Sequence, residues 1–276
     1  MNKPGAVTPF VKWVGGKRQL ISEVEKYFPQ HYATYYEPFI GGGAVLFHFL
    51  PKNAVINDTN AELVNLYRVV RDDVEALIED LKYHHNDADY FYALRAIDRS
   101  DAYADLSAVE KASRLHYLNK TCFNGLFRVN RAGQFNTPFG RYKNPNIINQ
   151  SVLTAVSHYL NQAQVKILNT DYQNALKGIA KNDFVYFDPP YDPISSSSNF
   201  TAYTQDGFDR NAQQRLKQTC DSLHQQGIRF LLSNSATDFI KDLYRDYDVH
   251  IVQAKRHINS KGHKRGLIDE VFVKNY

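Results

Sequence analysis

The sequence predicts an α/β protein with a doubly wound, mostly parallel sheet, interrupted by a mainly helical insertion that carries a β-hairpin. Two stretches in which strands and helices alternate, residues 34–58 and 165–274, indicate the sheet. Between them the alternation stops, and apolar residues recur at helical spacing. The last two expected strands have no helix between them, which predicts one antiparallel strand at the sheet edge.

The first part of the chain has the order helix, strand, glycine turn, helix, strand. Three consecutive glycines stand between the first strand and its helix, and Asp58 follows the second strand. This order is the opening of a doubly wound sheet. The five elements are expected at residues 17–28, 34–39, 40–43, 44–50 and 54–57.

The insertion is expected to be helical over residues 61–121, where leucines and valines recur at helical spacing. Ser107-Ala-Val-Glu110 has the form of a capping box that opens a helix. The later sequence FRVNRAGQFN predicts a hairpin that turns at Ala132-Gly133.

The third part resumes the alternation. Asp209 is expected to cap a helix that runs to Gln226, and Gly227 to end it. A further helix is expected over residues 237–244. The strands of this part are expected at residues 165–168, 184–187, 228–233, 250–254 and 270–274.

Composition restricts the class of protein. No apolar run approaches the ~20 residues that cross a bilayer, and the first residues lack the pattern of a signal peptide. The two cysteines, Cys122 and Cys220, cannot build a zinc site alone, so we expect a cytoplasmic protein without a metal. No obligatory protein partner is evident from the sequence.

The positive charge is gathered in three segments that contain no acid. Residues 1–22 carry four Lys/Arg, residues 111–150 carry seven, and residues 255–267 carry five. Such segments repel themselves unless a polyanion offsets the charge, so together they indicate a nucleic-acid partner.

The glycine turn Phe39-Ile-Gly-Gly-Gly43 allows a ligand to approach the backbone closely. Asp58 follows about twenty residues later, where an acid can accept hydrogen bonds from both hydroxyls of a ribose. Leu46 stands where a dinucleotide-binding motif has its third glycine, which disfavours NAD. The spacing predicts a cofactor that contains adenosine.

The segment Asp188-Pro-Pro-Tyr191 follows the buried strand at 184–187. Prolines forbid a helix and keep the chain extended, so the segment is expected to form a stiff lip at the sheet edge. Asp171 ends the preceding expected strand. Since parallel strands share one crevice at their carboxyl ends, Asp58, Asp171 and Asp188 are expected to line it.

Taken in order, KWVGGKR, FIGGG, IND, FNGLFRVNRAGQFNTPFGRYKNP and DPPY resemble the DNA adenine-N6 methyltransferases of the Dam and DpnM type. The likeness extends over nearly the whole chain. It implies a seven-stranded sheet of the S-adenosylmethionine-dependent methyltransferase type. It also implies a catalytic domain formed by residues 1–58 and 164–276, and a DNA target-recognition insertion at 59–163.

The resemblance implies S-adenosylmethionine as cofactor, and as substrate an adenine that is flipped out of double-stranded DNA, with GATC as the target sequence. The Asp188 carboxylate and the Pro189 carbonyl would each accept a hydrogen bond from one N–H group of the adenine amine. These two hydrogen bonds would make the amine nitrogen nucleophilic. Pro190 would stiffen the lip, and Tyr191 would stack on the flipped base.

The resemblance also implies which residues bind the cofactor and the DNA. The cofactor would contact Trp13, Lys17, Phe39, Gly41, Gly43, Asp58, Asp171 and Asp188. The DNA would contact Lys12, Phe123, Asn124, Arg128, Asn130, Pro138, Arg141, Lys255 and Lys264. Among these, Phe123 would wedge into the base stack, Arg128 would read a guanine, and Lys264 would hold phosphate.

Other functions remain open from sequence alone. The same amine chemistry could act on another DNA sequence, on RNA or on a protein amide, and a non-catalytic DNA-binding module could retain the pocket. The intact Asp188–Tyr191 lip argues against the module, and the basic hairpin argues against the amide. Covalent cytosine chemistry is disfavoured because neither cysteine follows a proline. The sequence does not distinguish a restriction–modification role from replication or repair marking.

Overall fold

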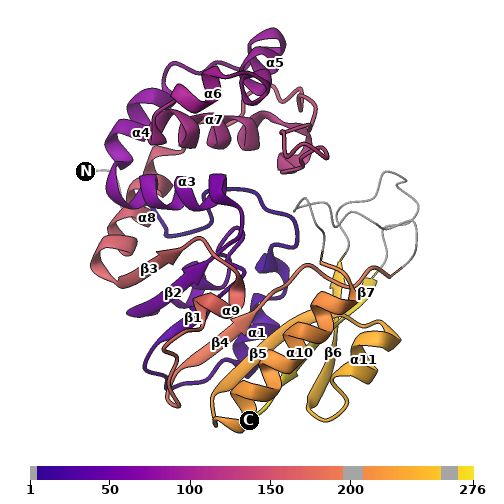
Figure 1. Ribbon diagram of the computed structural model, residues 1–276. Coiled ribbons are helices and arrows are strands. Elements are labelled where there is room, and N and C mark those ends of the chain that lie inside the picture. Colours follow the sequence, from indigo (N-terminus) through magenta and orange to yellow (C-terminus); the bar gives the residue numbers. More distant parts are fainter. Residues whose placement is uncertain (1–4, 195–207, 256–266) are drawn as a thin grey trace.

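The computed structural model describes residues 5–194, 208–255 and 267–276. Its centre is a seven-stranded sheet in the order β3-β2-β1-β4-β5-β7-β6 (Figure 1). The strands are β1 (Tyr35–Glu37), β2 (Asn53–Asn57), β3 (Gln164–Leu168), β4 (Phe184–Phe187), β5 (Arg229–Ser235), β6 (Asp248–Lys255) and β7 (Leu267–Lys274).

The helices of the described residues surround this sheet and form the insertion. The α-helices are α1 (Ile21–Tyr27), α2 (Leu46–Phe49), α3 (Ala61–Asp72), α4 (Val74–Leu81), α5 (Ala88–Ala96), α6 (Ala102–Asp105), α7 (Ala108–Thr121), α8 (Gln150–Gln162), α9 (Tyr172–Ala175), α10 (Arg210–Gln225) and α11 (Asp238–Leu243). Short 3-10 helices are η1 (Lys17–Gln19), η2 (Ile97–Arg99) and η3 (Phe123–Gly125).

The predicted α/β fold class, with a mostly parallel seven-stranded sheet, is confirmed. Strands β1 to β5 are parallel, and β7 is antiparallel to both of its neighbours, β5 and β6. The antiparallel strand lies one position in from the edge strand β6. Its residues Val271, Phe272 and Val273 are fully buried, whereas Ile251 of β6 is 59% exposed. The more apolar strand therefore takes the inner position, where both faces are covered.

Both faces of the sheet are packed, as a doubly wound fold requires. Side chains alternate along β4: Phe184 and Tyr186 join one apolar core, while Val185 and Phe187 join the other. Helices α1, α2, α3 and α8 cover the first face, and α9, α10 and α11 cover the second.

The insertion extends beyond the β3 side of the sheet (Figure 1). Helix α3 packs against α7 and α8, and α4 packs against α7. The capping box predicted at Ser107 and Glu110 is confirmed, with both hydrogen bonds present. Helix α8 was not among the predicted elements.

The predicted hairpin is confirmed at its turn. The Asn130 N–H donates to the Gln134 carbonyl at 2.9 Å, and the Gly133 N–H donates to the Asn130 carbonyl at 3.0 Å. Gly133 has φ +77°, a value that a glycine adopts without strain. Isolated bridges such as Val129 to Phe135 join its two arms.

Helix α5 and the adjoining η2 hold this hairpin by its backbone. Asp98 accepts a hydrogen bond from the Phe135 N–H at 2.8 Å, and Arg99 donates to the Phe135 carbonyl at 2.7 Å. The buried Arg114 pairs with Asp98 at 2.9 Å. The hairpin is therefore fixed by charged hydrogen bonds as well as by the burial of Phe135.

Candidate active site

One short segment near the amino terminus joins the insertion to the sheet. Lys12 exchanges two backbone hydrogen bonds with the Asn119 side chain of α7, at 2.8 and 2.7 Å. Trp13 stacks on Phe127 with 4.9 Å between ring centroids. Lys17 reaches the lip after β4. The motif KWVGGKR is thus a strap between the two parts of the fold.

The glycine turn after β1 is closed by Asp58. The Asp58 carboxylate accepts hydrogen bonds from the N–H groups of Gly41 at 3.1 Å and Asn60 at 2.9 Å. Burial raises the pKa of Asp58, and these backbone hydrogen bonds oppose the rise. A Cβ atom on Gly41 would lie 2.8 Å from the Trp13 ring, so glycine is required there by packing as well as by its φ of +46°.

Two other predicted pocket residues lie against neighbouring aromatic rings. Phe39 packs on Tyr172 with 5.2 Å between ring centroids. A Cβ atom on Gly43 would lie 2.6 Å from the Tyr67 hydroxyl oxygen, so no larger residue fits. The Tyr67 hydroxyl itself donates to the Gly41 carbonyl at 3.0 Å. Both faces of the turn are therefore held in place.

Asp171 stands at the predicted place after β3, but its carboxylate already has partners. One oxygen caps α9 by accepting from the Gln173 N–H at 2.9 Å. The other forms an ion pair with Arg215 at 2.7 Å. The carboxylate therefore caps α9 in this structure, and its contact with the cofactor stays a prediction.

Asp188 lies directly after β4, at the carboxyl end of the sheet, and its side chain is 19% exposed. Its Oδ1 pairs with Lys17 Nζ at 2.7 Å and accepts from the Ser233 hydroxyl at 2.8 Å. The sequence prediction placed Asp188 and Lys17 in the same cofactor site and did not foresee this direct contact. Among the described residues, no hydrogen bond reaches Asp188 Oδ2, which leaves one carboxylate oxygen for a ligand.

Lys17 contacts both ends of the lip. Its side chain is 4% exposed, and Nζ also donates to the Gly15 carbonyl at 2.9 Å. Nζ lies 4.5 Å from the ring centroid of Tyr191. The ammonium therefore sits between the acid and the ring of Asp188-Pro-Pro-Tyr191.

The lip is held from beneath by β5 and α10. The Pro190 carbonyl accepts from Gln213 at 2.8 Å. The buried Asp192 accepts from Thr237 at 2.7 Å and from Arg210 at 3.2 Å. Within the described residues, the Pro189 carbonyl receives no hydrogen bond. The sequence predicted that Asp188 and Pro189 accept hydrogen bonds from the substrate amine. Among the described residues, no group donates to Asp188 Oδ2 or to the Pro189 carbonyl oxygen.

Beneath the site, Glu37 ends β1 as a buried acid. It accepts a hydrogen bond from the Tyr35 hydroxyl at 2.7 Å. Burial raises its pKa to about 8, and the nearby Asp188 carboxylate adds to the rise, while Tyr35 and Lys17 oppose it. Glu37 therefore holds a proton at neutral pH. The sequence contained a signal for it, an acid inside an otherwise apolar strand.

The protonated Glu37 predicts how stability depends on pH. Since the pKa is about 8 in the folded protein and 4.5 ordinarily, the folded state keeps a proton that the unfolded chain releases. The contribution of neutral Glu37 to the free energy of unfolding is complete below pH 4.5 and is lost as pH rises towards 8. We expect Glu37→Gln to gain about 1.4 kcal/mol of unfolding free energy over wild type per pH unit within this window.

Urea unfolding at pH 5.5, 6.5 and 7.5 measures this gain. Glu75→Gln, which changes an exposed glutamate of α4, is the control and should follow wild type. Parallel curves for Glu37→Gln and wild type would show that Glu37 is ionised in the folded protein.

Several residues predicted to bind DNA form one exposed patch beside the end of α7. Phe123 is 53% exposed, and its N–H donates to the carbonyl of the exposed Pro138 at 2.8 Å. Asn124 is exposed in the left-handed region with φ +57°, and exposed Arg141 has φ +54°. The structure thus brings these four residues together on two adjacent loops.

Other predicted DNA-binding side chains already have partners within the protein. Arg128 donates through Nε to the Asn136 side chain at 2.6 Å, and through Nη2 to the Asn136 carbonyl at 3.2 Å. The Asn130 side chain closes the hairpin turn through Ala132 and Gln134. Lys12 Nζ lies over the ring of Tyr142 at 5.0 Å. Lys255 ends β6, and both its side chain and Lys264 lie outside the described residues.

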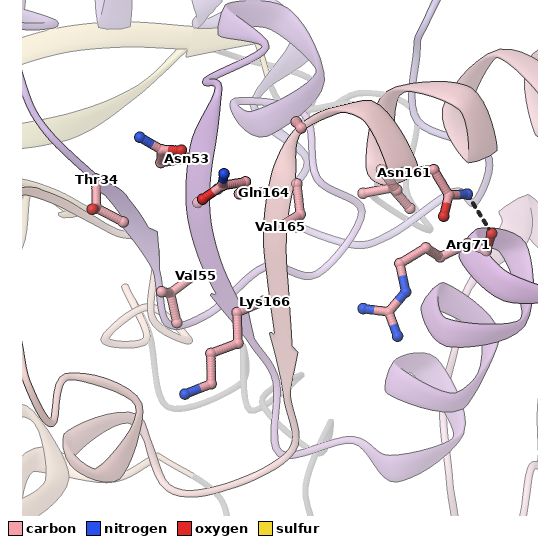
Figure 2. Close-up of a pocket in the computed structure, with 11 residues that line it drawn as sticks. Thr34, Asn53, Val55, Arg71, Asn161, Gln164, Val165 and Lys166 are labelled. Atoms are coloured by element: carbon pink, nitrogen blue, oxygen red, sulfur yellow. Dashed lines mark hydrogen bonds between the residues drawn. The ribbon is translucent and has the colours of Figure 1, made fainter.

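A separate pocket lies at the opposite end of the strands (Figure 2). Thr34, Asn53 and Gln164, which line it, stand at or next to the first residues of β1, β2 and β3. Asn161 donates to the Arg71 carbonyl there at 2.6 Å. Ligands of open α/β sheets bind at the carboxyl ends, so the site is placed at Asp58 and Asp188 instead.

No described helix has the length and apolarity that spanning a membrane requires. No group of His, Cys, Asp or Glu in this part of the chain is arranged to hold a metal ion.

Comparison with known proteins gives concordant matches. Residues 13–258 match the family described as D12 class N6 adenine-specific DNA methyltransferase. The chain is 44% identical to type II methyltransferase M1.LlaDCHI of Lactococcus lactis subsp. cremoris, over 97% of this chain and 95% of that one. It is 40% identical to type II methyltransferase M.MjaIII of Methanocaldococcus jannaschii, over 98% and 99%. A DNA adenine methylase of Haemophilus influenzae is 33% identical over 96% and 92%.

Proposed function

Because the chain belongs to the D12 class N6 adenine-specific DNA methyltransferases, we propose that it methylates an adenine flipped out of duplex DNA within the sequence GATC. That it is a site-specific, adenine-specific DNA methyltransferase follows from the family. The flipped substrate and GATC are the proposal. The observation that carries the flipped adenine is the Asp188–Tyr191 lip at the carboxyl end of β4, on the edge of the sheet that also carries the glycine turn and Asp58.

S-Adenosylmethionine, the family's methyl donor, fits the residues at the ends of β1 and β2. A carboxylate has about four acceptor positions, and Asp58 uses two of them on backbone N–H groups. The remaining positions suit the two hydroxyls of a ribose. Trp13, Phe39, Gly41 and Lys17 would provide the rest of the contacts. When bound, the cofactor supplies an electrophilic methyl group.

The lip would activate the amine of the substrate. The lone pair of that nitrogen is delocalised into the adenine ring, which makes the amine a poor nucleophile. Asp188 Oδ2 and the Pro189 carbonyl would each accept a hydrogen bond from one N–H group of the amine. These hydrogen bonds would localise the lone pair on the amine nitrogen. Since Ser233 and Gln213 hold the lip before substrate arrives, this alignment requires little reorganisation during the reaction.

The DNA would be held and read by residues 59–163, which we propose as the target-recognition insertion. The catalytic domain would comprise residues 1–58 and 164–276. Exposed Phe123 would wedge into the stack beside the flipped base. Tyr191 would stack on that base. Acting on DNA, the protein is expected to work in the cytoplasm.

The biological role proposed is modification within a restriction–modification pair. The two relatives that are 44% and 40% identical both carry the name type II methyltransferase. The 33% identical relative is named a DNA adenine methylase, which keeps replication or repair marking as the second candidate. The GATC target is supported by the sequence FNGLFRVNRAGQFNTPFGRYKNP, which resembles the reading segment of the Dam and DpnM type.

Methylation of plasmid DNA tests the proposal. The protein is incubated with labelled S-adenosylmethionine and plasmid, which is then digested with an endonuclease blocked by adenine methylation at GATC. Label in DNA together with protection at GATC is expected. Label without protection would refute GATC and point to another sequence, and label only in an RNA copy would refute the DNA substrate.

Arg128→Ala is expected to relax base preference. Asn136 holds Nε and Nη2 of Arg128, which leaves Nη1 for the edge of a base. Loss of a guanine contact removes ~1–3 kcal/mol of discrimination, or about 5- to 150-fold in the ratio of methylation rates on cognate and single-mismatch duplexes. Lys143→Ala, at an exposed lysine in the same segment, is the control and should weaken binding to all sequences alike. An unchanged rate ratio for Arg128→Ala would rule out its reading role.

A further inference from the structure

The hydroxyl group of Tyr191 is anchored by an acid that belongs to none of the motifs. It donates to Glu270 Oε2 at 2.8 Å. Glu270 lies near the start of β7 and is paired with Ser235 of β5 on one side and with Val252 of β6 on the other. Its backbone is therefore fixed on both sides by the sheet.

The antiparallel direction of β7 explains how Glu270 reaches the lip. The parallel strands β4 and β5 end at the edge of the sheet that carries the site, whereas β7 begins there. The lip crosses the end of β5, where the Asp192 N–H donates to Asn234 at 3.1 Å and the Ser235 hydroxyl donates to the Asp192 carbonyl at 2.6 Å. This crossing brings Tyr191 from β4 to β7.

The surroundings of Tyr191 favour its hydroxyl as the donor and Glu270 as the acceptor of this hydrogen bond. Burial raises the pKa of Tyr191 well above its ordinary value, so the hydroxyl keeps its proton and donates. Burial also raises the pKa of Glu270, while the Lys17 ammonium and the Tyr191 hydroxyl oppose that rise. Lys17, over the same ring, pairs with Asp188. The Asp188 carboxylate and the Ser233 hydroxyl also act on the Tyr191 hydroxyl, and Glu270 is the acceptor to which it donates at 2.8 Å.

We propose that Glu270 is a positioning residue for methyl transfer, which holds the Tyr191 ring at the angle at which the flipped adenine stacks. This inference rests on the stacking role proposed for Tyr191. Glu270 touches neither base nor cofactor in this scheme, and it acts through the tyrosine hydroxyl. A tyrosine ring held at both its backbone and its hydroxyl cannot turn away from the base.

The test combines single-turnover methylation with the fluorescence of 2-aminopurine placed at the target adenine. Glu270→Leu is expected to lower the single-turnover rate about 10- to 100-fold, the loss typical of a hydrogen bond to a charged group, with little change in DNA affinity. Glu270→Gln keeps an acceptor oxygen and should retain most of the rate. The flipped 2-aminopurine should be brighter with Glu270→Leu than with wild type, because a loosened ring stacks on it less and quenches it less.

A double-mutant cycle with Tyr191→Phe separates positioning from a general loss of structure. Tyr191→Phe removes the same hydrogen bond from the other side, and the double variant should be no slower than the slower single variant. Tyr191→Phe also carries the test if Glu270→Leu does not fold. Asp269→Leu, at the exposed neighbour on β7, is the control and should keep the wild-type rate.

The outcomes distinguish this inference from the proposed function. Wild-type rate and fluorescence for Glu270→Leu, or losses that multiply in the double variant, would overturn the positioning role alone. If wild-type protein transfers no methyl group to adenine in DNA, the proposed function itself fails, and the Glu270 inference fails with it.

Discussion

Asp188→Ala is expected to lower the single-turnover rate of adenine methylation by about 100- to 1000-fold, the loss typical of removing one preorganised catalytic group. Affinity for duplex DNA should change little, because phosphate contacts supply most of it. Lys17 and Ser233 hold Oδ1, and no described residue donates to Oδ2, so removal of the carboxylate takes away an aligned acceptor. In the variant, the Pro189 carbonyl would accept from one N–H group of the amine, and the other N–H group would have no acceptor.

The measurement is rapid-quench methylation at saturating cofactor, with DNA affinity measured separately by fluorescence anisotropy. Asp242→Ala removes an exposed carboxylate that is also ion-paired, with Arg245 at 3.2 Å, and is the control for the loss of a surface ion pair. It should react at the wild-type rate. A near wild-type rate for Asp188→Ala would refute the amine-activating role of the lip.

Lys17→Met is expected to have the second-largest effect, on stability and on cofactor affinity together. Removing one partner of a buried ion pair leaves the other charge uncompensated, which costs about 3–5 kcal/mol. Because Asp188 is 19% exposed, we expect the lower end of that range in the free energy of unfolding. We also expect a loss of at least about tenfold in affinity for S-adenosylmethionine, since a charged contact is removed.

The double variant Lys17→Met/Asp188→Asn separates the two consequences. Removing both charges should restore most of the unfolding free energy, because no unpaired ion remains. It should not restore methylation. Urea unfolding and calorimetric titration of the cofactor measure the two quantities. Equal stability of wild type, Lys17→Met and the double variant would show that the ion pair contributes nothing to the folded protein.

The parts of the site that the sequence could predict are those that local chemistry determines. The two prolines of the lip and the glycines of the turn set the backbone conformation where they stand, and Asp58 follows a strand that the sequence pattern predicts. The capping box at Ser107 and the turn at Gly133 are local in the same sense, and both are present. Patterns of this kind specify backbone conformation without knowledge of the rest of the fold.

The parts that the sequence could not predict depend on partners far apart in the chain. Lys17 and Asp188 meet only because the strap and the end of β4 converge on one edge of the sheet. Glu270 gives no motif signal, and its role follows from its hydrogen bond to Tyr191. Asp171 caps the short helix α9, a contact that the sequence prediction did not include, and its role in cofactor binding stays a prediction.

Sheet order was likewise only partly predictable. Alternating strands and helices predict a parallel sheet, and a final pair of strands predicts one antiparallel member. They do not specify which of the two joins β5. In the structure β7 takes that place, where Val271, Phe272 and Val273 are fully buried. The inner position of β7 then brings Glu270 to the lip.

The most direct test of the amine-activating lip is mass spectrometry of nucleosides from duplex DNA, after reaction with isotope-labelled S-adenosylmethionine and either wild-type protein or Asp188→Ala at equal DNA occupancy. We predict label in N6-methyladenine with wild-type protein, and at least about 100-fold less with the variant. Label on cytosine, or equal yields of N6-methyladenine from the two proteins, would contradict the assignment of the reaction to this lip.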